Sequence, residues 1–192
     1  MRLFLAVDLD SAGQRGVATA ISKFRHQCES SSRDLAYALR WSSPDTLHIT
    51  LHFLGEVDRG RLPLLRTALT PPIRLAPFEI EFGNLGIIST GGLSRLVRLD
   101  VASGADGLTE VHRELARRLV GAGFAVDSKP FEAHLTLARL KSPGSVDLGS
   151  VLSSRSIDPI GRCKIDHATL YRSQPSPLGS IYGSILRVTL ER

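Results

Sequence analysis

The sequence has 192 residues, of which 42% are hydrophobic and 22% are charged, with a formal net charge of +5. This length allows one sizeable hydrophobic core but not two comfortable domains, so we expect a single domain over residues 1–192. The composition excludes a largely disordered chain, and two cysteines are too few for a disulfide framework or a paired zinc site. The 20 Arg outnumber the 4 Lys, which favours a partner carrying phosphate or carboxylate groups.

The N-terminal stretch MRLFLAVDLD contains a short apolar run that Asp8 and Asp10 interrupt. The run is too short for a secretion signal or a membrane span, so we expect a cytoplasmic protein without membrane contact. Residues 2–9 predict a buried strand. The next segment, 11–28, predicts a helix because Val17, Ile21 and Phe24 recur at helical spacing.

The middle of the chain alternates between strands and helices. Residues 35–41 and 47–54 predict strands, and 59–70 predicts a helix that Pro71 and Pro72 end. Two further strands, 77–89 and 95–101, flank the turn sequence STGGLS. Four apolar residues at spacings of three or four predict a helix that stops at residues 121–123: Leu108, Val111, Leu115 and Leu119.

The C-terminal third predicts more strands than helices. A strand over 131–140 precedes a loop over 141–161, and the strands 164–173 and 182–190 flank a turn at 175–180. A strand-helix-strand order in each half is typical of an α+β protein, in which helices cover the outer faces of antiparallel sheets. We expect a monomer, because no long exposed apolar stripe is left over.

One motif occurs twice, as HITLHFL at 48–54 and as HLTLARL at 134–140. Residues i and i+2 of a strand lie about 6.6 Å apart on the same face, so each copy presents one imidazole and one hydroxyl. These are His48 with Thr50, and His134 with Thr136. A single His-x-Thr occurs by chance, whereas two copies followed by Leu in similar halves indicate a paired site.

Two facing copies would suit a phosphodiester. One neutral histidine can take a proton from the attacking oxygen while the other, protonated, donates one to the leaving oxygen, and each role contributes roughly 10² to 10⁴ in rate. The threonine hydroxyls can donate hydrogen bonds to the non-bridging oxygens. A metal site is the alternative, but His48 and His52 lie about 13 Å apart on a regular strand and cannot share an ion. We therefore expect no metal.

The segments WSSPDTLHITLHFLGEV (41–57) and KPFEAHLTLARL (129–140) resemble the two signature strands of the two-histidine phosphoesterase superfamily, and within it the RNA 2',3'-cyclic phosphodiesterases, also called 2'-5' RNA ligases. The opening RLFLAVDL and the closing LYRSQPSPLGSIYGSILRVTL also resemble this family, so the resemblance covers nearly the whole chain. One departure is Ala133, where the family often has proline.

The resemblance implies two pseudo-symmetric lobes, each an antiparallel sheet backed by helices, with a basic cleft between them and no cofactor. It implies hydrolysis of a 2',3'-cyclic phosphate at an RNA end to a 2'-phosphomonoester, with weak reverse 2'-5' ligation. Carried over to this sequence, His134 is the base that activates water and His48 the acid, and the two roles can be exchanged for synthesis or for a substrate bound the other way. Thr50 and Thr136 hold the phosphate oxygens, with Arg139 nearby.

Other residues are candidates for substrate contact. Trp41 and Phe82 are candidates for stacking on RNA bases, which is how single-stranded ends are usually held. His52 shares the face of His48 if the strand is regular, and would then touch RNA at the mouth of the cleft. By the same alternation, Phe53 and Phe131 are expected in the core.

Two alternative functions stay open at this point. One is a phosphodiesterase for small nucleotides, such as a cyclic phosphate of ADP-ribose or 2'-5' oligoadenylate. The other is a module that binds an RNA end or AMP without turnover, although pure binding does not need two proton-transfer groups.

Overall fold

The computed structural model describes residues 1–31, 33–142, 144, 146, 148, 160–176 and 179–192. It is an α+β protein with two five-stranded sheets, whose strand orders are β3-β1-β9-β10-β4 and β2-β7-β6-β5-β8. Neighbouring strands are antiparallel except for the parallel pair β10–β4. The α+β fold expected from the sequence is confirmed.

The helices are α1 (Ser11–Ser31), α2 (Arg33–Ala38), α3 (Leu62–Leu69) and α4 (Ala105–Gly121), with 3₁₀ turns at Pro44–Thr46 and Arg59–Arg61. The first sheet contains β1 (Arg2–Asp8), β3 (His48–Glu56), β4 (Ile73–Arg74), β9 (His167–Ser176) and β10 (Gly179–Glu191). The second contains β2 (Leu39–Trp41), β5 (Phe78–Thr90), β6 (Leu93–Ser103), β7 (His134–Leu140) and β8 (Ile160–Ile165).

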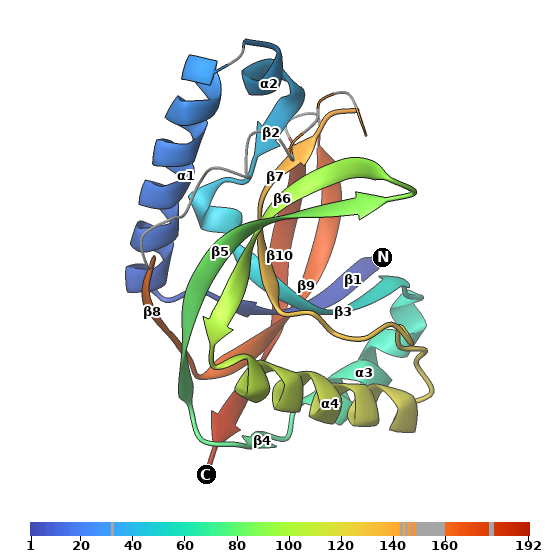
Figure 1. Ribbon diagram of the computed structural model, residues 1–192. Coiled ribbons are helices and arrows are strands. Elements are labelled where there is room, and N and C mark those ends of the chain that lie inside the picture. Colours follow the sequence, from blue (N-terminus) through green and yellow to red (C-terminus); the bar gives the residue numbers. More distant parts are fainter. Residues whose placement is uncertain (32, 143, 145, 147, 149–159, 177–178) are drawn as a thin grey trace.

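The two sheets do not correspond to successive halves of the chain. The first sheet combines β1, β3 and β4 with the last two strands, while β2 is already part of the second sheet. Figure 1 shows α1 along one side of the molecule and α3 beside α4 at its lower end. The chain therefore crosses between the sheets several times, and this crossing brings β3 and β7 into contact with each other.

A single cluster of buried side chains extends through both sheets and beneath the helices. In α4 the predicted stripe is buried, because Leu108, Val111, Leu115 and Leu119 have no solvent exposure. In α1, Val17, Ile21 and Phe24 are buried as their spacing predicted. The apolar spacing of these two helices therefore fixed which of their faces covers the core.

Several element boundaries differ from the sequence prediction. Residues 33–38 form helix α2, and only 39–41 form a strand, because β2 needs β7 as its partner. Strand β7 begins at His134, not at residue 131. The predicted strand 164–173 is divided between two sheets, because Lys164 and Ile165 end β8 and the segment from His167 belongs to β9.

Most of the expected 141–161 loop and the centre of the expected 175–180 turn lie outside the described residues. Within the described part, no helix is long and apolar enough to cross a membrane.

Candidate active site

Both copies of the repeated motif line one cavity of about 340 Å³. His48 and Thr50 come from β3, and His134 and Thr136 come from β7. The intervening Ile49 and Leu135 are fully buried, so the polar residues of each motif share one face as the alternation predicts. The structure therefore brings together two imidazoles and two hydroxyls that lie 86 residues apart in the sequence.

Each motif contains a β-bulge at the leucine that follows its threonine. Along β3 the partners of β1 pass from Thr50 to His52 and leave Leu51 unpaired. Along β7 the partners of β6 pass from Thr136 to Ala138 and leave Leu137 unpaired. A bulge reverses the alternation of the residues that follow it and often re-aims a side chain near a functional site.

The two bulges direct Phe53 and Arg139 into the cavity, although both residues lie an odd number of positions from their histidines. Phe53 is 65% exposed, so the prediction that it belongs to the core is wrong. Arg139 reaches the cavity as the resemblance implied. At the β7 bulge, the backbone N–H of Ser42 donates a hydrogen bond to the Leu137 carbonyl oxygen (2.8 Å). The Ser42 hydroxyl donates a second one to the Thr136 carbonyl oxygen (2.9 Å), and the two bonds stabilise the altered register.

The two histidines are held in the same way. His48 Nδ1 lies 2.7 Å from the Thr46 carbonyl oxygen, and His134 Nδ1 lies 2.8 Å from the Glu132 carbonyl oxygen. Because a carbonyl only accepts, each Nδ1 must carry the proton that it donates. In each ring Nε2 is therefore the nitrogen left for proton transfer.

Burial lowers the pKa of both histidines. It is the largest cause for His48, where the nearby Arg139 charge lowers the pKa further while the Thr46 carbonyl and the Asp8 carboxylate raise it. Burial also lowers the pKa of His134, against the hydrogen bond to the Glu132 carbonyl. Both rings therefore favour the neutral form in the free protein, and an anion bound between them would favour the protonated form of either.

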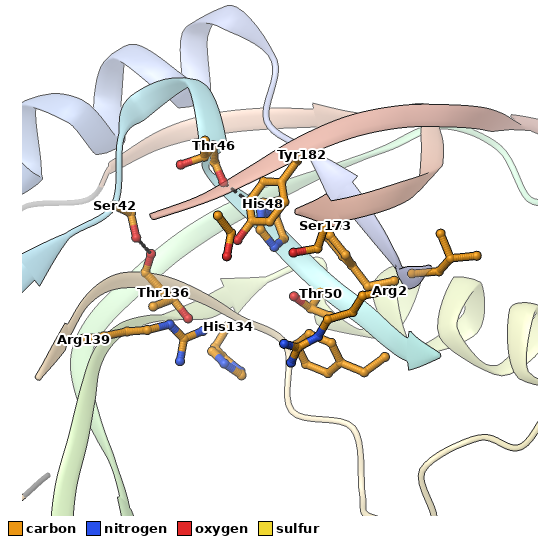
Figure 2. A pocket seen from close by; sticks show the side chains of 14 residues that line it. Arg2, Ser42, Thr46, His48, Thr50, His134, Thr136, Arg139, Ser173 and Tyr182 are labelled. Carbon is orange, nitrogen blue, oxygen red and sulfur yellow. Dashed lines mark hydrogen bonds between the residues drawn. The ribbon is translucent and has the colours of Figure 1, made fainter. Parts of the chain in front are cut away.

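The cavity contains residues that the sequence analysis missed (Figure 2). The ring of Tyr182, from β10, contacts the His48 ring edge-on at a centroid distance of 5.2 Å. The Phe4 ring lies 5.1 Å from the same imidazole and 5.0 Å from the Tyr182 ring, so the three rings contact one another. The other polar lining residues are Arg2, Ser42, Thr46, Ser173 and Ser180. The position of Arg2 follows from the pairing of β1 with β3, which the sequence gives no local signal for.

Two predicted stacking aromatics lie elsewhere. Phe82 is 2% exposed and belongs to the core, so its assignment to base stacking is wrong. The physical reason is its parity, because it shares the inward face of β5 with Ile80. Trp41 is half-buried, packs edge-on against Phe24 at 5.7 Å, and does not line this cavity.

His52 is also placed differently from its prediction. The Leu51 bulge directs its side chain into the core, where it is 4% exposed, so it does not share the face of His48. Its Nε2 lies 2.9 Å from the His112 carbonyl oxygen, and its ring stacks on the His112 ring. Among the described residues, no three His, Cys, Asp or Glu side chains gather in a metal-binding arrangement. The metal-free site stays a prediction.

Comparison with known proteins identifies the family. The family model of the 2'-5' RNA ligase superfamily matches residues 14–176. The chain belongs to this superfamily. Its membership confirms the resemblance that the twin His-x-Thr strands indicated.

Relatives of the superfamily match most of the chain. An RNA 2',3'-cyclic phosphodiesterase of Methanothermobacter thermautotrophicus is 28% identical over 184 residues, 95% of each chain. Another, of Aeropyrum pernix, is 30% identical over 75% of this chain and 82% of that protein. A crystal structure of Escherichia coli LigT complexed with 3'-AMP has a TM-score of 0.74 and 24% identity, and covers 100% of this chain and 98% of that chain. This likeness shows that the two-sheet fold is shared.

Proposed function

We propose that the protein hydrolyses 2',3'-cyclic phosphates at RNA ends to 2'-phosphomonoesters, using His48 and His134 as the two proton-transfer groups. The observation that carries the proposal is the convergence of both His-x-Thr motifs on one cavity with Arg139. Two relatives that each cover 95% of this chain are RNA 2',3'-cyclic phosphodiesterases, which supports the same reaction.

In this proposal water attacks phosphorus on the side opposite the 3'-oxygen. His134 Nε2 takes the proton of the attacking water as the new P–O bond forms. The bond from phosphorus to the 3'-oxygen breaks, and protonated His48 Nε2 donates its proton to that oxygen. The product keeps its phosphate on the 2'-oxygen, and the two rings have exchanged protonation states. Weak ligation through a 2'-5' linkage is the same displacement with an RNA 5'-hydroxyl in place of water: His134 takes the proton of that hydroxyl, and the 3'-oxygen leaves with the proton of His48.

The remaining side chains stabilise charge on the phosphate. The Thr50 and Thr136 side chains line the cavity, and in this proposal their hydroxyls donate hydrogen bonds to the non-bridging oxygens while the Arg139 guanidinium forms two parallel hydrogen bonds. Preorganised donors of this kind cost little rearrangement during the reaction. The site therefore contains groups for proton transfer and for charge stabilisation within the chain's own residues.

The test is incubation with adenosine 2',3'-cyclic phosphate in excess EDTA, followed by separation of the 2'- and 3'-phosphate products. We expect turnover that the chelator does not reduce, with the 2'-phosphate as the product. A 3'-phosphate product or a requirement for a divalent ion would contradict the mechanism. Tight binding without turnover, measured on the same sample, would instead assign the protein to the non-catalytic binding modules.

A further inference from the structure

A second cavity of about 540 Å³ adjoins the catalytic one. The two cavities share five lining residues: Thr50, Phe53, His134, Thr136 and Arg139. The second is lined by His134 but not by His48, so it extends away from the β9–β10 side of the site. A substrate bound at the two histidines therefore has direct access to it.

The walls of the two cavities differ in chemistry. The catalytic cavity is lined mainly by hydroxyls, imidazoles and arginines, which suit a phosphate and a ribose. The second cavity has one apolar wall, formed by Leu51, Leu96, Pro130 and Phe131 with the exposed ring of Phe53 at the junction. Its remaining lining residues, apart from those shared with the catalytic cavity, are polar: His52, His112, Asp127, Lys129 and Glu132. Apolar and aromatic walls of this kind suit a flat nucleobase rather than another anion.

Phe131, which the sequence predicted to lie in the core, is only half-buried and lines this cavity, where another ring supports it. Its ring stacks on the His112 ring at a centroid distance of 4.5 Å and an interplanar angle of 13°. The His112 ring in turn stacks on the His52 ring at 4.0 Å and 20°. The hydrogen bond between His52 Nε2 and the His112 carbonyl fixes the inner end of this column of three rings. The outer ring is therefore held in a defined orientation beside the cavity.

The column is uncharged at neutral pH. Burial lowers the pKa of His112 to about 4, with the neighbouring His52 as a further cause, and burial also lowers the pKa of His52. A neutral aromatic platform favours stacking of any base without selecting its sequence. The charged side chains that line this cavity balance, with Lys129 and Arg139 against Asp127 and Glu132, which favours a neutral base over a second phosphate.

We propose that the second cavity binds the base of the nucleotide that precedes the cyclic-phosphate end, with Phe131 as its stacking platform. The inference rests on the proposed function and names its substrate as an RNA strand of at least two nucleotides. Each cavity alone falls within the range of about 300 to 1,000 Å³ that holds a small-molecule ligand, so the second cavity has room for a base beside a nucleotide bound in the first.

The experiment compares kcat/KM for adenosine 2',3'-cyclic phosphate with kcat/KM for the dinucleotide ApA that ends in a 2',3'-cyclic phosphate. We expect the wild type to favour the dinucleotide at least fivefold, equivalent to about 1 kcal/mol, the lower limit for stacking one base. Phe131→Ala should reduce this preference to near one, and Phe131→Tyr, which keeps the ring, should retain it. The matched control is Tyr37→Ala, an aromatic residue that is 82% exposed on α2 and lines neither cavity.

Two results would overturn the proposal. One is equal kcat/KM of the wild type for the two substrates. The other is a Phe131→Ala variant that folds normally by thermal melting but loses activity on both substrates by the same factor. In either case continued hydrolysis of the mononucleotide would leave the proposed function standing, whereas hydrolysis of neither substrate by the wild type would refute the function itself.

Discussion

Arg139 offers a sharp test of how the site stabilises charge. Its guanidinium points into the cavity beside Thr136 and His134 (Figure 2), and its charge lowers the pKa of His48. Removal of one preorganised donor to developing negative charge typically reduces kcat by about 10² to 10³, equivalent to about 2.7 to 4 kcal/mol. We expect Arg139→Ala to lower kcat/KM for a cyclic phosphate by this factor. Arg139→Lys should fall between this variant and the wild type, because it keeps the charge but loses the planar fork.

The assay measures initial rates at constant ionic strength across a range of pH, with thermal melting to confirm folding. Loss of the Arg139 charge removes one cause that lowers the pKa of His48, so the limb of the pH profile that His48 controls should move to higher pH. With His48 as the acid, this is the alkaline limb. Arg95→Ala is the control, since Arg95 is exposed on β6 and lines neither cavity. The reasoning is refuted if Arg139→Ala stays within threefold of wild type or if the control loses as much.

Two further predictions concern the framework around the site. Asp8 accepts hydrogen bonds from Thr169 (2.8 Å) and Tyr171 (2.6 Å) and raises the pKa of His48, so Asp8→Asn should move the alkaline limb of kcat/KM to lower pH. Movement of the acidic limb instead would exchange the roles of the two histidines. Gly104→Ala should lower the free energy of unfolding by about 2 kcal/mol, because Gly104 has φ of 77° and an added Cβ would meet the Glu79 carbonyl oxygen. Gly121→Ala, with nothing within 4 Å of its added Cβ, should not lower that free energy in urea unfolding; equal losses would contradict the account.

The parts of the fold that could be predicted are those in which local pattern decides the outcome. The spacing of Leu108 to Leu119 was enough to place α4, and the alternation of Ile49 with the polar residues of its motif was enough to orient His48 and Thr50. In both cases the burial of one apolar face is the largest contribution to the stability of the element, and the spacing of apolar residues in the sequence shows which face that is.

The parts that could not be predicted depend on partner strands. The bulges at Leu51 and Leu137 arise from pairing with β1 and β6, so nothing local showed that Phe53 would turn outward and His52 inward. Arg139 was predicted in the site only from the family resemblance, because regular strand alternation places its side chain on the opposite face from His134. Phe82 is different, since its parity with Ile80 in the predicted strand is a local pattern that indicates the core, whereas its aromatic ring alone does not indicate base stacking.

The most direct test of the central claim is hydrolysis of adenosine 2',3'-cyclic phosphate by His48→Ala and His134→Ala, each compared with the wild type. Each ring is assigned one proton transfer, so each variant should lose roughly 10² to 10⁴ in kcat at neutral pH. His26→Ala, an exposed histidine on α1, should keep wild-type activity. If either site variant keeps activity within tenfold of wild type, the two imidazoles do not act as the acid and base on one phosphorus.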